Sequence, residues 1–262
     1  MFKVSGCRLS SAMLLTLLLT ANASLANGPY RSDAKAAYEP VFSWSGIYLG
    51  VHAGGGFGTS QWQNFQNPLF APNIIGYDPG GGTLSGFLGG VQLGANYQIH
   101  KIVIGVEGDV SWTRITASTA CGAGAQCSVD PILFDTHIDR LASVTGRIGG
   151  VAGSALLYVK GGIAWTQESL NVHCTASGNC LVPVVAFNVS ANETRQGWTF
   201  GTGVEYAFGA HWFGKLEYDF YDFGGGTIRF PAGNTAGPSV GGFSVDLTQQ
   251  IHTVKAGLNY RF

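Results

Sequence analysis

The chain has 262 residues, a formal net charge of -1 and 11% charged residues, far below the roughly 25% of typical soluble domains. It contains 40 glycines, well above the average share of roughly 7%, and 12% of its residues are aromatic. This composition argues against a disordered chain and gives no indication of a polyanion-binding surface. It favours a β-protein with much of its outer surface in lipid, and a secreted soluble β-sandwich is the alternative.

The amino terminus has the pattern of a secretory signal peptide. Lys3 and Arg8 precede a short apolar stretch at 9–21, and small residues follow up to Ala26. The apolar stretch is shorter than the roughly 20 residues that a membrane-spanning helix needs. We therefore expect cleavage after Ala26, with Ala23 as the alternative site.

Four cysteines follow the signal in two pairs of identical spacing: Cys121 with Cys127, and Cys174 with Cys180. An exported chain enters an oxidising compartment, in which disulfides form. Four cysteines allow three connectivities. We predict the two local disulfides, because they close the smallest loops. A zinc site with four thiolate ligands is the competing hypothesis, although such sites usually have more closely spaced cysteines.

From Trp44 onward, apolar residues alternate with polar residues or glycine in eight separate segments. This alternation is typical of strands, in which successive side chains point to opposite faces. The expected strands are 44–57, 89–98, 102–113, 142–148, 157–165, 198–208, 212–221 and 251–262. No segment has an amphipathic helical period, so we expect no separate periplasmic domain. Five tryptophans fall near strand ends, as an aromatic girdle requires: Trp44, Trp112, Trp165, Trp198 and Trp212.

The links between these strands alternate in length. Long links are expected at about 60–82, 116–137, 167–192 and 223–244, and short turns at 99–101, 152–154 and 209–211. Outer-membrane barrels have an even number of strands, short periplasmic turns and longer extracellular loops. The predicted fold is therefore all-β, an eight-stranded antiparallel transmembrane β-barrel. The expected domains are a signal peptide, a flexible periplasmic N-terminus and an outer-membrane barrel: 1–26, 27–42 and 43–262.

The last strand, at 251–262, is apolar on one face and polar on the other. Alternate residues from Val254 to Phe262 are apolar, and the residues between them include Lys255 and Arg261. The segment ends on an aromatic residue. Because closure of a barrel pairs its last strand with its first, 254–262 should run antiparallel to 44–57.

Five short motifs occur at the predicted strands: W-S-G-I-Y-L-G at 44–50, G-V-E-G-D at 105–109, Y-V-K-G-G at 158–162, K-L-E-Y at 215–218 and V-K-A-G-L-N-Y-R-F at 254–262. Together they resemble the OmpA-like outer-membrane β-barrel family of alphaproteobacteria, which are porin-like surface antigens. The resemblance implies an eight-stranded monomeric barrel with a structural or surface-antigen role, and haem binding in some relatives. It also implies that Tyr260 and Phe262 belong to a signal read by the outer-membrane barrel-assembly machinery.

The inward positions of the predicted strands collect five acidic and five basic residues. They are Glu107, Asp109, Glu205, Glu217, Asp219, Arg147, Lys160, Lys215, Lys255 and Arg261. An eight-stranded barrel is only wide enough for side chains to fill it, and an unpaired buried charge is strongly unfavourable. We therefore predict a network of ion pairs that plugs the barrel and fixes its shape. A narrow or gated pore lined by the same residues is the alternative.

Two histidines, His137 and His173, lie in or beside long loops, where haem or metal capture is conceivable. A loop histidine is more often simply part of a polar surface. An enzyme would need a nucleophile with its base, but no G-x-S-x-G motif occurs, and no histidine can be assigned from the sequence to the inward Ser111 or Ser143. We expect no enzymatic activity, no catalytic or metal-binding residue and no cofactor.

The sequence thus predicts a structural protein and surface antigen of the outer membrane of a Gram-negative bacterium. The expected partners are the lipid bilayer with its lipopolysaccharide, the barrel-assembly machinery, and host or environmental ligands at the loops, with no nucleic acid. The alternative functions are a narrow porin and a haem-binding protein.

Overall fold

The structure, a computed structural model, describes residues 42–66, 80–120, 133–174, 187–231 and 242–262. The predicted signal peptide and nearly all of the predicted periplasmic N-terminus lie outside the described residues. Cys121, Cys127 and Cys180 lie outside them too, and only the backbone of Cys174 is described. The two disulfides therefore stay a prediction.

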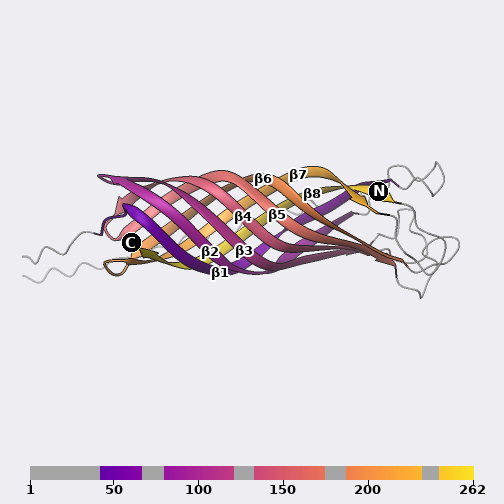
Figure 1. Ribbon diagram of the computed structural model, residues 1–262, viewed down its shortest axis with the longest axis horizontal. Coiled ribbons are helices and arrows are strands. Elements are labelled where there is room, and N and C mark those ends of the chain that lie inside the picture. The colour runs from indigo at the N-terminus through magenta and orange to yellow at the C-terminus, as the bar shows by residue number, and fades with distance from the viewer. Residues whose placement is uncertain (1–41, 67–79, 121–132, 175–186, 232–241) are drawn as a thin grey trace, which may run out of the picture. The chain divides into compact units, whose positions relative to one another are not determined.

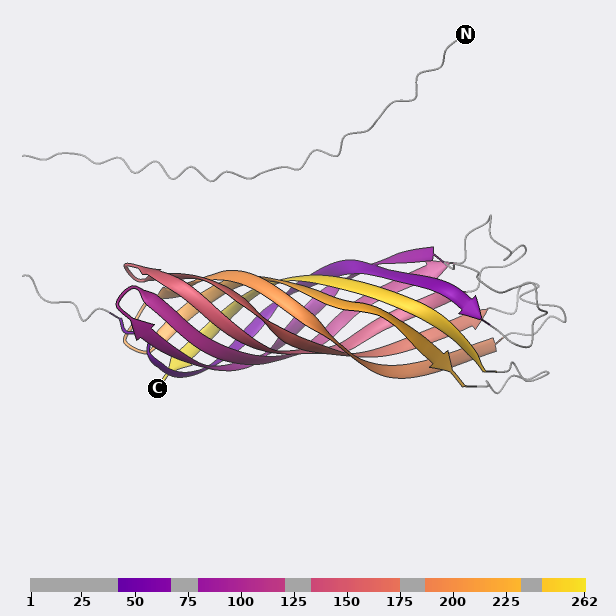
Figure 2. The same cartoon turned by 90° about the horizontal axis from the view of Figure 1, so that it is seen from above.

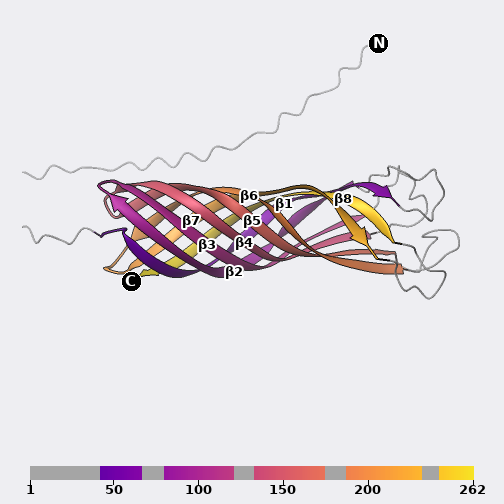
Figure 3. The same ribbon diagram turned by 45° about the horizontal axis from the view of Figure 1, so that its top comes forward.

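Eight antiparallel strands form one closed barrel, in which each strand pairs with its neighbours in the sequence and β8 pairs with β1 (Figures 1 and 2). The strands wind obliquely around the barrel (Figure 3). They are β1 Gly46–Gln66, β2 Gly80–Ile99, β3 Ile102–Ala120, β4 Leu133–Ala152, β5 Ala155–Cys174, β6 Phe187–Ala207, β7 Trp212–Phe230 and β8 Phe243–Arg261. In the described ranges, no helix is long and apolar enough to cross a membrane. The predicted eight-stranded antiparallel barrel is confirmed.

Short turns join the strands at one end of the barrel, which also holds the C-terminus (Figure 1). We call it the turn end, and we call the opposite end the loop end. Two of the turns contain a residue with positive φ, His100 at 56° and Gly153 at 62°. Tight hairpin turns need this conformation, because its backbone twist matches that of the flanking strands.

The closure of the barrel has the predicted partners. β1 and β8 pair antiparallel from Tyr48 opposite Arg261 to Phe57 opposite His252, and the ladder continues beyond that pair toward the loop end. Toward the turn end, the side chains of β8 alternate between the lipid-facing surface and the interior as the sequence predicts. The last segment of the chain is therefore the strand that closes the barrel.

The strands are longer than the sequence pattern predicted. Each has 19 to 21 residues, and the ends of the four predicted long loops belong to strands. The pairing of β1 with β2 continues to Trp62, for example, and the pairing of β3 with β4 to Ala120. At about 3.3 Å per residue and a tilt of about 45°, such strands span about 47 Å along the barrel axis.

The polarity of the barrel wall reverses along its axis. Between the turn end and the middle of the barrel, the outward side chains are apolar and the inward ones include the polar and charged residues. Near the loop end the inward side chains of β8 are Phe243, Val245 and Leu247, and all three are buried. The outward residues between and beyond them are Ser244, Asp246 and Thr248. The predicted strand ends were wrong because the prediction required apolar residues on the outer face. The chain continues to alternate toward the loop end, but there the apolar residues face inward and the polar residues face outward.

The apolar outer surface forms a belt of limited height. On β3 it extends from Ile102 to Trp112, whose side chains are 54% and 53% exposed. About ten residues at a tilt of about 45° span about 23 Å, close to the roughly 25 Å of the apolar band of outer-membrane barrels. The strands therefore extend about 20 Å beyond the belt at the loop end. We call this part the extension.

Aromatic side chains mark the two borders of the belt. At the turn end these are Tyr97, Tyr206, Phe208, Trp212 and Phe262, and toward the extension they are Phe57, Phe87, Trp112 and Trp198. Trp44 is a correction to the predicted girdle. It is 1% exposed and packs inside the barrel against Phe213, with 5.3 Å between the ring centroids.

Three apolar clusters lie inside the barrel at different levels. The first fills the turn end and includes Trp44, Leu156 and Phe213. The second, the middle cluster, lies near the border between belt and extension and consists of Leu84, Leu88, Ile115, Ala117, Ile138, Leu141, Ala164, Tyr221, Phe223 and Ile251. The third fills the extension and includes Trp62 and Phe134. The extension thus resembles a water-soluble β-barrel, with a polar outer surface and an apolar core.

The ladder between β6 and β7 is shorter than the other seven. It runs from Ala207 opposite Phe213 only as far as Trp198 opposite Asp222. Both strands continue toward the loop end in pairing with their other neighbours. Among the described residues, the facing edges of β6 and β7 therefore have no ladder pairing beyond Trp198. We call this unpaired stretch the seam.

Candidate functional site

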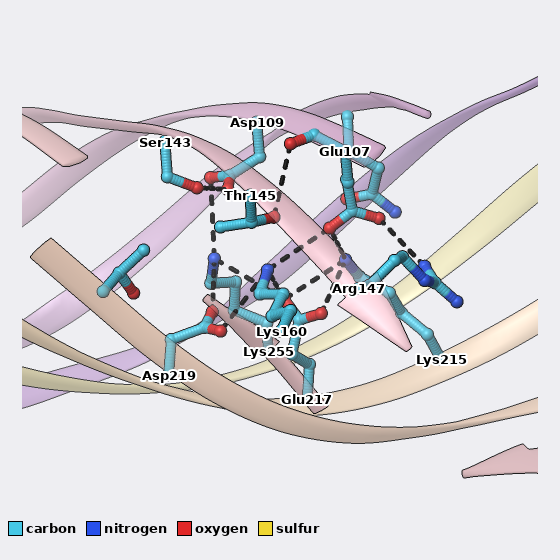
Figure 4. A network of polar contacts seen from close by, with 12 residues as sticks. Glu107, Asp109, Ser143, Thr145, Arg147, Lys160, Lys215, Glu217, Asp219 and Lys255 are labelled. Atoms are coloured by element: carbon cyan, nitrogen blue, oxygen red, sulfur yellow. Dashed lines mark hydrogen bonds and ion pairs between the residues drawn. The ribbon is translucent and has the colours of Figure 1, made fainter. Parts of the chain in front are cut away.

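The polar interior at the level of the belt is the candidate site (Figure 4). It lies between the apolar cluster of the turn end and the middle cluster. Nine of the ten predicted interior charges are buried there: Glu107, Asp109, Arg147, Lys160, Glu205, Lys215, Glu217, Asp219 and Lys255. They come from β3, β4, β5, β6, β7 and β8, so strands that are far apart in the sequence contribute to one cluster.

The first half of the cluster is centred on Arg147. Its guanidinium donates to both carboxylate oxygens of Glu205, at 2.8 and 2.6 Å, in the bidentate geometry that makes arginine–carboxylate pairs strong. A third contact joins Arg147 to Glu107 at 3.4 Å. The guanidinium also lies 4.1 Å from the ring centroid of Tyr158, and the Tyr48 hydroxyl donates to Glu107 at 2.7 Å.

Three lysines form the second half. The Lys160 ammonium lies 2.8 Å from a carboxylate oxygen of Glu217, and Lys215 lies 3.2 Å from the same oxygen. Lys255 lies 2.8 Å from Asp219. Figure 4 shows how the carboxylates surround these ammonium groups. Because each lysine contacts at least two carboxylates, the loss of one lysine affects several acidic residues.

Glycines make room for the two tyrosines of the cluster. A Cβ on Gly94 would lie 2.2 Å from the Tyr48 hydroxyl, and one on Gly203 would lie 2.5 Å from the Tyr158 hydroxyl. Any larger residue at either position would displace the ring. Neither tyrosine was among the predicted interior residues, although the alternation of β1 and β5 places both of them inward.

Arg261 does not belong to the charge cluster, and its predicted place there was wrong. Its side chain is half-buried at the rim of the turn end, where it donates to the carbonyl of Ala210 at 3.0 Å and lies over the ring of Phe42 at 4.4 Å. Among the described residues it has no ion-pair partner. Arg261 lies outside the cluster because of its position along the barrel axis. It follows the inward Lys255 and Asn259 toward the turn end, where the interior is filled by aromatic residues.

A chain of hydrogen bonds adjoins the charges. His52 Nδ1 contacts Gln92 Oε1, and Gln92 donates to Asn259 at 2.6 Å. On the other side of the ring, Ser111 Oγ lies 2.8 Å from His52 Nε2. No sequence pattern had indicated this serine–histidine pair. Such a pair can be a nucleophile with its base, but Ser111 is 1% and His52 5% exposed, so a substrate has no access to them.

A second polar group lies beyond the middle cluster, inside the extension. Arg195 of β6 donates to the carbonyls of Phe223 and Gly224 on β7, at 3.1 and 2.6 Å, and of Leu247 on β8, at 3.0 Å. These contacts join the two strands where their ladder has stopped. Arg195 is therefore a clasp at the foot of the seam.

Glu168 is the acidic partner of this clasp. Its carboxylate lies 3.6 Å from the Arg195 guanidinium and is fully buried. Burial raises the pKa of the Glu168 carboxyl, and the charge of Arg195 opposes this change. The pair was not predicted because Glu168 fell into the predicted loop at 167–192 and Arg195 lay between that loop and the predicted strand at 198–208.

The other predicted residues lie at the surface or outside the described part of the chain. His137 is exposed on the outer face of the extension, and on the same face His173 lies 3.3 Å from Asp135. The described residues hold no group of three or more histidine, cysteine or acidic side chains that could bind a metal ion. Tyr260 packs against Trp212 and Phe262 at the turn end, with ring centroids 5.0 and 5.3 Å apart.

The described interior therefore holds its charged groups in pairs and away from solvent. The five acidic and four basic side chains of the cluster pair with one another, and apolar clusters cover the charged level on both sides. This arrangement suits a plug that joins the strands across the barrel. It offers no bound substrate a route to a reactive group.

Known proteins resemble this chain over most of its length. Residues 14–262 match the family model described as outer membrane protein beta-barrel domain. The 31 kDa outer-membrane immunogenic protein of Brucella melitensis is 30% identical over 240 residues, which cover 88% of this chain and 89% of that protein. The 25 kDa outer-membrane immunogenic protein of Brucella abortus is 27% identical over 197 residues, 72% of this chain and 74% of that protein.

Among solved structures, the outer membrane protease OmpT from Escherichia coli is similar to this chain with a TM-score of 0.52 and 8% sequence identity. The similarity covers 83% of this chain and 97% of that one. At this identity it shows the fold alone. The matches place the protein in the outer membrane, so the turn end is periplasmic and the loop end extracellular.

Lys255→Met should strongly destabilise the barrel. The substitution keeps the volume but leaves Asp219 and Asp109 without the cation that lies 2.8 and 3.5 Å from them. Removing one partner of a buried ion pair costs about 3–5 kcal/mol. Urea unfolding of the protein in detergent, followed by tryptophan fluorescence, measures the loss. Lys101→Met, at an exposed turn, is the control and should unfold like the wild type. Equal midpoints for all three proteins would contradict a structural role of the charges.

Arg195→Met should loosen the seam without unfolding the belt. The variant loses three hydrogen bonds to carbonyls and leaves Glu168 buried without a cation. Hydrogen exchange measured by mass spectrometry should become faster in 188–197 and 223–230 and stay unchanged in the last ten residues. Adding Glu168→Gln should restore part of the protection, because the buried charge is then removed. Unchanged exchange in Arg195→Met would refute the clasp.

Proposed function

The chain belongs to the outer membrane protein β-barrel domain family, and from this premise we propose that its work is structural. In this proposal the protein is a closed barrel that contributes to the integrity of the outer membrane and presents its extension and loops at the cell surface. The conducting alternative requires a continuous path of water through the barrel.

The observation that carries the proposal is the filling of the interior. A conducting path would have to pass the aromatic cluster of the turn end, the paired charges and the middle cluster in turn. Glu107, Glu205 and Lys255 are each 1% exposed or less, although charged side chains that line an open pore would be in contact with water. A network held by bidentate and multiple ion pairs also resists opening, because each step would leave a buried charge unpaired.

The extension supports the second part of the proposal. It raises the strand ends that flank 67–79, 121–132, 175–186 and 232–241 about 20 Å above the belt. Its outer face carries polar residues such as Asn192, Gln196 and Thr227, all exposed. A polar surface at this height suits a protein displayed to the surroundings of the cell, as a surface antigen is.

Recordings in planar lipid bilayers test the closed barrel. We expect no current steps from the refolded protein, because its interior has no open path for ions. A general porin measured under the same conditions is the positive control. The variant Phe213→Ala/Leu156→Ala, which opens the cluster of the turn end but keeps the charges, should stay silent as well. Regular steps from the wild-type protein would support the narrow pore and end the structural proposal.

Export and assembly complete the proposal. Residues 1–26 would direct export and be removed after Ala26, and the terminal Phe262 would present the assembly signal. The Phe262 ring is 71% exposed at the periplasmic end, next to Tyr260, so another protein can reach it.

Deletion of Phe262 should reduce the amount of protein assembled in the outer membrane by roughly tenfold, a loss of recognition worth about 1.4 kcal/mol. The backbone N–H of Phe262 donates one hydrogen bond to the carbonyl of Ile47. The variant Phe262→Ala keeps this bond, so it distinguishes the effect of losing the ring from the effect of shortening the chain. We expect Phe262→Trp to assemble normally and Phe262→Ala to fail like the deletion. Fractionation followed by heat-modifiable migration on gels measures the yield, and a normal yield of the deletion would exclude the signal.

A further inference from the structure

We propose that Arg114 and Arg140 form a binding site for the phosphate groups of a lipid A-type glycolipid in the outer leaflet of the membrane. The proposal rests on the outer-membrane location of the protein and is independent of whether the barrel conducts. It assigns the site to the outer face of β3 and β4, where the apolar belt meets the extension.

Both arginines are neighbours of aromatic residues that border the belt. Arg114 pairs across the ladder with Phe87, which is 82% exposed, and Arg140 pairs with Trp112, which is 53% exposed. Cross-strand partners of this kind lie side by side on one face of the sheet. Each guanidinium is thus carried next to an aromatic ring at the height where acyl chains give way to headgroups.

Regular alternation places both arginines on the outer face, because Arg140 pairs with the outward Trp112 and Arg114 follows Trp112 by two residues. Two β-bulges lie beside them. The β3–β4 ladder shifts between Trp112 and Ile115, and the β4–β5 ladder shifts at Asp139. Bulges redirect side chains, and here Asp139 and Arg140 are consecutive and both exposed on the outer face. Arg114 therefore lies diagonally across from Arg140, a spacing of about 7–8 Å between backbones that long side chains bridge easily.

The two guanidinium groups are available to a ligand. In the described part of the chain, the side chains of Arg114 and Arg140 have no ion-pair or hydrogen-bond partner. Asp139 is the carboxylate nearest in the sequence, and it accepts a hydrogen bond from Ser169 of β5 at 2.7 Å. Its charge is thereby directed toward β5.

Two further facts favour a phosphorylated glycolipid as the ligand. Planar guanidinium groups bind phosphate through paired, charge-assisted hydrogen bonds, and the site continues the lipid-facing surface of Phe87 and Trp112. The opposite side of the barrel differs, because Asp222 of β7 and Gln250 of β8 occupy the same border and hydrogen bond to each other at 3.2 Å. The basic site thus faces one sector of the membrane.

Native mass spectrometry of the full protein, delipidated in detergent, tests the site. The probes are lipid A with both phosphates, the same lipid after removal of both phosphates, and phosphatidylglycerol. We expect the wild type to bind the bisphosphorylated lipid at least tenfold more tightly than either of the other two. Arg114→Gln/Arg140→Gln should lose about tenfold in affinity for that lipid alone, since a charge-assisted hydrogen bond contributes about that factor.

Arg229→Gln is the matched control, because Arg229 is also exposed on the outer face but lies in the extension on β7, away from the aromatic border. It should bind all three lipids like the wild type. Heat-modifiable migration verifies that each variant is folded, and the two single variants replace the double one if that fails to fold. Three results would overturn the site: an equal loss in Arg229→Gln, equal binding of phosphate-free lipid, or equal binding of phosphatidylglycerol, which indicates attraction to any anionic lipid.

Discussion

A buried charge must be paired, and this constraint organises the interior of the barrel. The lipid around the belt requires apolar residues on the outer face, so the alternation of each strand directs its polar residues inward. Inside a narrow barrel, acidic and basic residues can stay charged only in contact with one another. Arg147 of β4 therefore contacts Glu205 of β6, and Lys255 of β8 contacts Asp109 of β3. Such contacts connect strands that share no ladder, which gives the closed sheet cross-links that backbone hydrogen bonds do not provide.

The same alternation has the opposite consequence outside the membrane. Where water replaces lipid, the outer face becomes polar and the interior becomes an ordinary apolar core around Trp62 and Phe134. The alternation of β8 continues without interruption through the change, from Phe243 to Arg261. At the border between lipid and water, the apolar residues thus pass from the outer face of the strand to the inner face, and the polar residues pass from the inner face to the outer. The two arginines of the proposed lipid site lie at that border.

The sequence was sufficient for the strand number, the closure and nine of the ten interior charges, because all of these depend on the alternation of residues. It was insufficient where the rule that polar residues face inward no longer holds. Val245 and Leu247 were left out of the predicted strand at 251–262, although they alternate with polar residues just as Val254 and Leu258 do. Arg261 was misplaced for a different reason, since parity gives the face of a residue but not its height along the barrel. Contacts such as that of Ser111 with His52 depend on the register between strands, which no single sequence contains.

Two irregular features of the wall lie at one level. The bulge at Asp139 on β4 and the one between Asp222 and Gly225 on β7 both lie just beyond the belt. Each adds one residue to its strand, so the inward positions change from odd to even numbers: Leu141 gives way to Ile138, and Phe223 to Ile228. The β7 bulge also coincides with the end of the β6–β7 ladder, and Arg195 contacts the carbonyls of Phe223 and Gly224 at that point. In a regular strand consecutive carbonyls point to opposite neighbours, so the bulge is what allows Arg195 to contact both. The clasp and the bulge therefore depend on each other, and a change in either should alter the seam before it affects the belt.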